Sequence, residues 1–346
     1  MIEKVLILAH TESDGALGMP ALEALAQAKD LGGELYVGLI GEGVQSAADQ
    51  IASCGAAKFI GVCGPAFQQS RYSSDALAAE AIGKAAGAQI IIVPATARWN
   101  RVLAGVAHRL GGRADMHVTR VSLENDSLAV SRWYYRQRME ANLKRSHHPW
   151  CIALEPGCHE PWSGASGSAT VENLTVTWDE QSPRTVVSGI RTPAADLQTI
   201  RPEAKLLFVA GAGWTKKQAD GEIRVEEAGQ IILRFLEQSK ASLGGSKSVV
   251  DLGGEGQAVL PFMTHLNQIG QTGATPRHAK GLSTCCHGEE PHVVGWRFVN
   301  ERRAINLDAN CSWAAGKCDV LYVIDAFKVM TRVSELLAES KLVPAG

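Results

Sequence analysis

The chain has 346 residues, of which 45% are hydrophobic and 20% charged, and its formal net charge is −2. This length allows two domains, and the composition is typical of a globular protein with a well-filled core. The small net charge favours neither nucleic acid nor an anionic membrane as a partner, and no apolar run reaches the roughly 20 residues that span a bilayer. Because the first residues lack the basic and apolar regions of a signal peptide, we expect a cytoplasmic protein.

Apolar runs alternate with helical patterns over the first 110 residues. The predicted strands cover residues 4–9, 34–40, 58–62 and 89–94. The predicted helices cover residues 20–31, 44–54, 73–86 and 99–110. Strands that alternate with helices predict a parallel, doubly wound sheet. Thr96 follows the fourth strand and is interpreted as the N-cap of the next helix, with a position facing a ligand or subunit as the alternative.

The pattern changes after residue 115. Alternating segments at residues 116–123, 128–135, 151–155 and 170–178 predict antiparallel strands. Residues 132–148 are dense in Arg, Lys and His, and we interpret them as a solvated, partly paired surface; an acidic partner or a phosphate is the alternative. Pro193 and Pro202 bracket a connection, so we expect one domain over residues 1–198 and a second over residues 199–346.

A second α/β pattern opens with a strand at residues 205–210 and the turn Gly211-Ala212-Gly213. The remaining predicted elements are helices at 225–238, 260–266 and 327–337, and strands at 248–252, 304–307 and 320–324. The predicted fold class is therefore α/β with two doubly wound domains. The first carries an antiparallel strand extension, and the second is Rossmann-like.

Residues 270–296 hold the stretch around which we expect the second domain to be organised. It begins with Gly-Gln-Thr-Gly at residues 270–273 and continues with Cys-Cys-His-Gly at residues 285–288. Glycine-rich turns let a backbone approach a ligand closely, because no Cβ intervenes. The sequence therefore predicts two irregular turns that form the wall of a nucleotide or flavin site.

Eight cysteines are spread along the chain, and none forms the Cys-x-x-Cys pair typical of zinc or redox sites. In a reducing compartment most such cysteines behave as small buried hydrophobic residues, and we expect the same here. An iron–sulfur cluster is the alternative. Its candidate ligands would be Cys285, Cys286, Cys311 and Cys318.

Several of these motifs resemble the α subunit of electron transfer flavoproteins, over most of the chain and most specifically in its last third. Residues 269–273, Ile-Gly-Gln-Thr-Gly, are similar to the family's flavin-binding Val-Gly-Gln-Thr-Gly. His292 falls on a family histidine, and residues 304–306 fall on the family's Ala-Ile-Asn. Residues 245–248 look like the family's Gly-Ala-Ser-Arg, and Asp319 and Asp325 fit two later family aspartates.

The resemblance implies a partner and a cofactor. Members pair this subunit with a smaller β subunit and hold FAD mainly on the C-terminal domain of α. The N-terminal domain serves as a scaffold that contacts β. The FAD carries electrons from a flavin-dependent dehydrogenase to a quinone-linked oxidoreductase. Whether the partner subunit binds AMP is left open. We therefore expect an electron carrier rather than a substrate-converting enzyme, and no catalytic triad is evident.

The resemblance also assigns roles to residues. Those carried over to FAD binding are Ser246, Lys247, Gln271, Thr272, Gly273, His287, Gly288, His292, Asn306 and Asp319. Gln271 and Thr272 would bond the isoalloxazine edge, and His292 would donate to the pyrimidine oxygen. Ser246 and Lys247 would hold the pyrophosphate. Asn306 and Asp319 would bind the ribityl-phosphate or adenosine end. A satisfied core histidine is the alternative for His292.

Departures from the family pattern concern charge. The family's arginine in the first glycine turn of this domain is missing at residues 211–214, Gly-Ala-Gly-Trp, and Lys216 and Lys217 are not in register with it. The loss of a fixed cation near the flavin predicts a lower flavin potential. A protonated His287 is the alternative source of positive charge. The alternative function is a non-redox nucleotide-binding or structural subunit that has lost flavin chemistry.

Overall fold

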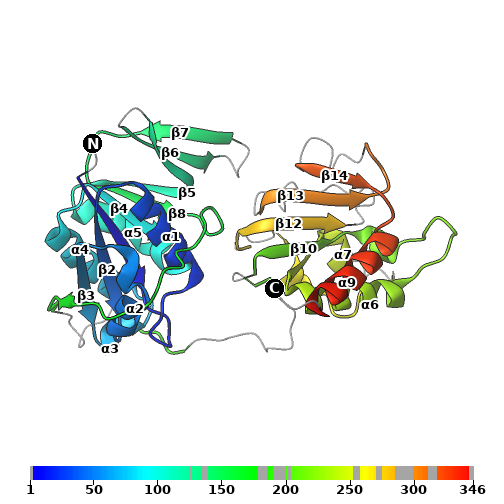
Figure 1. Cartoon of the computed structure of the whole chain (residues 1–346), viewed down its shortest axis with the longest axis horizontal. Coiled ribbons are helices and arrows are strands. Elements are labelled where there is room, and N and C mark those ends of the chain that lie inside the picture. Colours follow the sequence, from blue (N-terminus) through cyan, green and yellow to red (C-terminus); the bar gives the residue numbers. More distant parts are fainter. Residues whose placement is uncertain are drawn as a thin grey trace. The chain divides into compact units, whose positions relative to one another are not determined.

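A computed structural model describes residues 3–124, 127–134, 139–177, 185–189, 200–201, 204–251, 258–269, 275–284, 299–310 and 318–342. The chain divides into two compact units, Met1–Arg191 and Thr192–Gly346, and each is an α/β structure as the sequence predicts (Figure 1). The expected boundary between residues 198 and 199 falls slightly later, among residues outside the described part. No helix in the described ranges is long and apolar enough to cross a membrane.

Unit 1 contains a nine-stranded sheet in the order β7-β6-β5-β8-β4-β1-β2-β3-β9. The strands are β1 Lys4–His10, β2 Glu34–Gly41, β3 Lys58–Cys63, β4 Ile90–Pro94, β5 Arg113–Glu124, β6 Ser127–Tyr134, β7 Met139–Lys144, β8 Trp150–Leu154 and β9 Val171–Asn173. β1 lies in the interior of the sheet and runs parallel to both of its neighbours, with Val5 opposite Leu35 and Ile90. The predicted parallel, doubly wound sheet is therefore confirmed.

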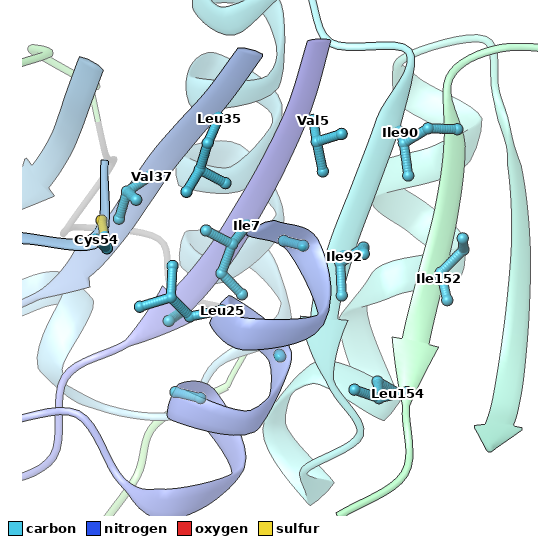
Figure 2. Close-up of a cluster of buried hydrophobic side chains, with 14 of the residues drawn as sticks. Val5, Ile7, Leu25, Leu35, Val37, Cys54, Ile90, Ile92, Ile152 and Leu154 are labelled. Atoms are coloured by element: carbon cyan, nitrogen blue, oxygen red, sulfur yellow. The ribbon is translucent and has the colours of Figure 1, made fainter. Parts of the chain in front are cut away.

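Helices cover both faces of this sheet, because its strands are apolar on both sides. The helices are α1 Met19–Asp30, α2 Gln45–Gln50, η1 Ala52–Cys54, α3 Pro65–Gln68, α4 Tyr72–Ala86 and α5 Ala97–Arg109. Val5 and Ile7 point to the side of α1 and α2, where Leu25 and Cys54 pack (Figure 2). Leu6 and Leu8 point to the opposite side, which α4 and α5 cover. Each buried Leu or Ile contributes about 1.5–3 kcal/mol to folding.

The antiparallel extension predicted after residue 115 is confirmed as β5, β6 and β7. The sequence reasoning missed β7, because its residues lie inside the basic run at 132–148. Asp115, which is 1% exposed, ties the extension together. Its carboxylate accepts hydrogen bonds from Arg132 (2.8 Å), Arg145 (2.5 Å) and the indole of Trp150 (2.9 Å). The basic run is therefore partly paired, and two of its arginines serve a buried acid.

Two strands that the sequence predicts to be antiparallel are parallel instead. β8 lies between β4 and β5 and runs parallel to both. All five of its side chains are buried, which is typical of an interior parallel strand rather than an alternating one. β9 is shorter than predicted and pairs in parallel with β3, at the far edge of the sheet. It follows a small-residue strap that crosses α2, where the Gly167 amide donates to the carbonyl of Asp49.

Unit 2 contains a five-stranded parallel sheet in the order β11-β10-β12-β13-β14. The strands are β10 Leu206–Ala210, β11 Ser242–Gly245, β12 His278–Thr284, β13 Val299–Asn306 and β14 Val320–Val323. The helices are η2 Ala212–Thr215, α6 Val225–Ser239, α7 Lys247–Asp251, η4 His265–Asn267 and α9 Ala326–Leu342. In chain order this is a 2-1-3-4-5 sheet, a common doubly wound arrangement.

Three predicted features of unit 2 are wrong in detail. The strand predicted at residues 248–252 overlaps helix α7, Lys247–Asp251, and the real strand is β11, whose residues are Ser-Leu-Gly-Gly. The helix predicted at residues 260–266 is a turn followed by the short 3-10 helix η4, His265–Asn267. The stretch at 270–296, expected to be irregular turns, includes the interior strand β12. Both strands contain glycine, which has a low strand propensity, and the sequence pattern therefore did not predict them. Here glycine is needed for packing: a Cβ on Gly281 would lie 2.5 Å from Val299.

Candidate cofactor-binding site

The order of the strands in unit 2 locates its ligand site. In a 2-1-3-4-5 sheet the ligand lies beyond the carboxyl ends of the strands, where the chain switches from one side of the first strand to the other. In unit 2 this point lies between β10 and β12. The residues at this edge are Gly211 after β10, Ser246 after β11, Thr284 at the end of β12 and Asn306 at the end of β13.

The segment that leads into the glycine-rich stretch also lies at this edge. Gln268 forms a parallel bridge with Gly245, and the Ile269 amide donates to the carbonyl of Gly245 at 3.1 Å. This close approach requires glycine, because a Cβ on Gly244 would lie 2.3 Å from Cδ1 of Ile269. The structure therefore brings the segment that leads into residues 270–273 next to Ser246, which sequence separation alone does not reveal.

A buried indole joins the two sides of the switch point. Trp214 in η2 is fully buried, and its Nε1 donates to Oγ1 of Thr284 at 2.8 Å. The Thr284 hydroxyl donates in turn to the carbonyl of Val209, and the Thr284 carbonyl accepts from the amide of Gly211 at 2.8 Å. Three hydrogen bonds thus fix the end of β12 to the end of β10 and to the turn after it.

Four of the ten predicted site residues lie in the described part of the chain. Ser246 is buried, and its amide donates to the carbonyl of Ala210 at 3.1 Å. Lys247 begins α7 directly after it. Asn306 is also buried, and its Oδ1 accepts from the amide of Leu307. These three lie at the carboxyl edge of the sheet.

Asp319 lies elsewhere. It precedes β14, and its carboxylate accepts from the amide of Arg302 at 2.6 Å, four residues before Asn306 on the neighbouring strand. The structure therefore does not bring Asp319 to the edge that holds Ser246 and Asn306. Asp325, after β14, caps α9 by accepting from the amide of Phe327 at 2.8 Å.

The other predicted site residues fall outside the described part, so their roles stay predictions. They are Gln271, Thr272, Gly273, His287, Gly288 and His292. Of the four cysteines considered for a cluster, only Cys318 is described, and burial raises its pKa. The described ranges contain no group of three or more His, Cys, Asp or Glu side chains that could hold a metal ion. Cys54 and Cys151 are buried as expected, whereas Cys63 is exposed and Cys158 and Cys318 are half-buried, and burial raises the pKa of Cys151 to about 12.

The chemistry of the described edge fits a polar ligand such as a flavin nucleotide. Two buried atoms near it, Oε1 of Gln268 and Oγ of Ser283, have no hydrogen-bond partner among the described residues. Buried polar atoms are nearly always satisfied, so such atoms indicate a missing polar group or water. Gln268 was not a predicted site residue. Its position two residues before the Gly-Gln-Thr-Gly motif was the signal that could have found it.

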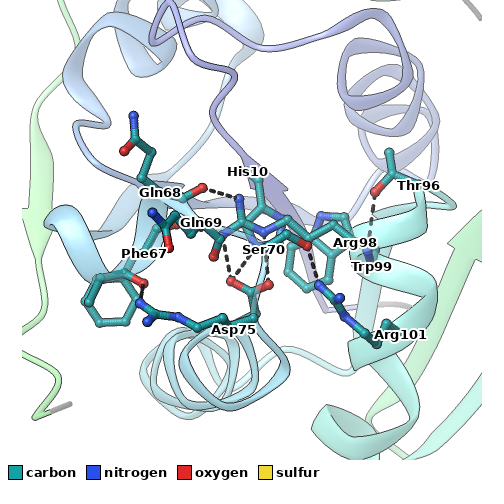
Figure 3. A network of polar contacts seen from close by, with 12 residues as sticks. His10, Phe67, Gln68, Gln69, Ser70, Asp75, Thr96, Arg98, Trp99 and Arg101 are labelled. Atoms are coloured by element: carbon teal, nitrogen blue, oxygen red, sulfur yellow. Dashed lines mark hydrogen bonds and ion pairs between the residues drawn. The ribbon is translucent and has the colours of Figure 1, made fainter. Parts of the chain in front are cut away.

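The corresponding switch point of unit 1, between β1 and β4, is filled by side chains (Figure 3). His10 ends β1, stacks on Trp99 with ring centroids 4.4 Å apart, and lies 3.4 Å from Asp75. Burial lowers the pKa of His10 to about 4. Thr96 caps α5, since its hydroxyl accepts from the amide of Trp99 at 3.3 Å, and the N-cap interpretation is therefore confirmed.

Comparisons with known proteins agree with this architecture. A family model described as the electron transfer flavoprotein domain matches residues 5–178. The electron transfer flavoprotein subunit alpha of Syntrophomonas wolfei is 26% identical over 340 residues, which are 94% of this chain and 96% of the relative. The protein of the same name from Clostridium acetobutylicum is 26% identical over 342 residues, 95% of each chain. Protein FixB of Clostridium saccharobutylicum is 25% identical over 206 residues, 59% of this chain and 56% of the relative.

The family match lies within unit 1, whereas the alignments with the two alpha subunits cover nearly the whole chain and so include unit 2. The strand order of unit 2 and the polar groups at its carboxyl edge are compatible with a flavin-binding role. The chain therefore belongs to the electron transfer flavoprotein family, and it is of the α-subunit type.

Proposed function

We propose that unit 2 binds FAD at the carboxyl edge between β10 and β12, and that the chain works as an electron carrier together with a β-type subunit. The observation that supports this most is the meeting of Ser246 and the segment leading into residues 270–273 at the carboxyl end of β11, next to the switch point strand β10. The names of the aligned relatives support the same function.

The predicted site residues would contact different parts of the cofactor. Ser246 and Lys247, at the start of α7, would hold the pyrophosphate, and Asn306 would bind the ribityl or adenosine part. Gln271, Thr272 and Gly273 would lie along the isoalloxazine, with His287 and Gly288 nearby. His292 would donate a hydrogen bond to the pyrimidine oxygen. Asp319 lies apart from this edge, and a contact with the adenosine end would require the cofactor to extend across β13 and β14.

A flavin accepts and releases electrons, and the protein around it sets the potential at which it does so. The chain's own contribution is to bind and orient the cofactor and to supply hydrogen bonds where negative charge develops. The turn itself, Gly211–Trp214, carries no cationic side chain, and the lysines that follow η2 come later: Lys216 is half-buried, and Lys217 is exposed and forms a bridge with Ile223. We expect a low flavin potential for this reason.

We further propose a flavin-dependent dehydrogenase as the electron donor and a quinone-linked oxidoreductase as the electron acceptor. AMP in the β-type subunit and a cytoplasmic location belong to the same proposal.

Co-expression of the chain with a β-type subunit, followed by the visible spectrum of the complex, tests the proposal. Bands typical of oxidised flavin, with one FAD released per complex on denaturation, are expected. A colourless complex would overturn the proposal and favour a non-redox nucleotide-binding or structural subunit. Broad charge-transfer absorption with stoichiometric iron would instead favour a cluster on the cysteines.

His292→Ala tests the placement of the isoalloxazine. If His292 donates to the pyrimidine oxygen, its loss removes a hydrogen bond to a site of developing charge and lowers the flavin potential while the chain stays folded. Spectroelectrochemical titration of the complex measures this. An unchanged potential would remove His292 from the site, and His265→Ala, on η4, serves as a control outside the predicted contacts.

A further inference from the structure

We infer that Trp214 and Thr284 form a positioning pair that holds the two walls of the cofactor site in unit 2 at a fixed separation. The inference rests on the proposed function and adds two residues to it. Neither residue is among the predicted cofactor contacts, and the pair acts through the backbone rather than on the cofactor itself.

The pair lies between the two segments that bound the switch point. One wall is the turn that begins at Gly211, and the other is the carboxyl end of β12 at Thr284. Any rotation of the first wall relative to the second has to break the hydrogen bond between Nε1 of Trp214 and Oγ1 of Thr284.

The bond is difficult to replace. Trp214 and Thr284 are both 0% exposed, so water cannot substitute for either partner. Leaving one partner of a buried hydrogen bond unsatisfied costs more than the bond itself contributes. The indole ring also packs against Phe327 of α9, with ring centroids 4.6 Å apart, so the turn is held from the core side as well. The turn therefore has one favoured position relative to β12.

Small displacements of such walls matter to a bound ligand, because hydrogen-bond geometry weakens steeply away from its optimum. The turn at residues 211–214 has no charged or long polar side chain, so its backbone groups are what it can offer a ligand, and Trp214 holds that backbone relative to β12.

Thr284→Val tests the inference in the complex with the β-type subunit, because valine keeps the volume of threonine and removes the hydroxyl. Thr284→Ser restores the hydroxyl. Trp150→Phe is the matched control, since it also removes a buried indole hydrogen bond, at 2.9 Å from Asp115 in unit 1. Titration with FAD measures the dissociation constant, the visible bands report the flavin environment, and hydrogen exchange measures protection of the amides over residues 211–216.

For Thr284→Val we expect a dissociation constant for FAD raised roughly three- to tenfold, shifted flavin bands, and faster exchange over residues 211–216. Thr284→Ser and Trp150→Phe should stay near the wild type in all three measurements. Where Thr284→Val reduces the folded yield, Trp214→Phe keeps an aromatic ring against Phe327 and should give the same result.

Faster exchange with an unchanged dissociation constant and unchanged bands would overturn the inference, because the pair would then serve the fold alone. Unchanged exchange would overturn it as well. A wild-type complex that takes up no FAD would overturn both the proposed function and this inference. This outcome is distinguishable from the others because it is measured on the wild type, before any substitution is made.

Discussion

Arg98 and Asp75 form a buried, two-pronged ion pair in unit 1, with Nε of Arg98 2.9 Å from Oδ2 and Nη2 2.6 Å from Oδ1 of Asp75. The Asp75 carboxylate is 0% exposed. Although burial opposes its ionisation, the contact with His10 and the hydrogen bonds from Arg98 lower the pKa of Asp75. The same guanidinium donates to the carbonyls of Phe67 and Gln68, so one side chain ties α3, α4 and α5 together (Figure 3).

Arg98→Met should destabilise unit 1 by about 3–5 kcal/mol, because it leaves the buried Asp75 carboxylate without its main counter-ion. Urea unfolding followed by circular dichroism measures the change. Arg109→Met is the control: its partner Glu80 is nearer the surface, and the loss should stay below about 1 kcal/mol. Equal losses for the two variants would contradict the prediction.

His10 should make unit 1 less stable in mild acid. Burial lowers its pKa from 6.5 in an unfolded chain to about 4 in the folded one. Between these values the unfolded chain binds the proton more readily, so stability is full above pH 6.5 and falls by about 3 kcal/mol as the pH drops to 4. His10→Gln should flatten this part of the pH profile. The exposed His108→Gln should leave it unchanged, and a steep profile in His10→Gln would refute the assignment.

Glu23 should act in the opposite direction. It lies on α1, accepts the amide hydrogen of Gly157 at 2.6 Å, and burial raises its pKa from 4.5 to about 7. The folded state therefore binds the proton more tightly, and this contribution is full below pH 4.5 and lost, by about 3 kcal/mol, as the pH rises through 7. Glu23→Gln should raise the free energy of unfolding at pH 8 relative to the wild type. The exposed Glu34→Gln should not, and equal shifts would contradict the prediction.

Gly244 and Gly245 offer a test of how the glycine-rich segment is held in unit 2. A Cβ on Gly244 would meet both Cδ1 and Cγ1 of the buried Ile269, at 2.3 and 2.6 Å, and so displace the segment beside Ser246. Gly244→Ala should cost about 1–3 kcal/mol of stability and weaken FAD binding. On Gly245 the nearest atom is the flexible end of Met263, so Gly245→Ala should cost less. Thermal unfolding and FAD titration of both variants check this, and the reverse order would refute it.

The first 110 residues were readable from the sequence because their strands are continuous apolar runs. Residues 4–9 and 89–94, predicted as strands, are β1 and β4 within a residue at either end. The direction of β8 was not readable. Its five apolar residues fit either an antiparallel extension or an interior parallel strand, and only the long-range pairing with β4 decides between them.

Unit 2 was less readable because packing overrides local preference there. β11 consists of one serine, one leucine and two glycines, so its local sequence does not favour a strand, and its pairing with β10 is what makes it one. The pattern singled out the glycine-rich stretch, whose role stays a prediction. It could not show that Gln268 meets Gly245, or that Trp214 bonds Thr284 seventy residues later, because neither contact leaves a local trace.

The strand order of unit 1 has a mechanical consequence. β7 and β9 form opposite margins of the sheet, separated by eight strand spacings, or roughly 40 Å if the sheet were flat. β9 is the last strand of unit 1 in the sequence, whereas the antiparallel extension ends at the β7 margin. A force applied at the β9 margin would therefore reach a protein docked on the β7 margin only through the full width of the sheet.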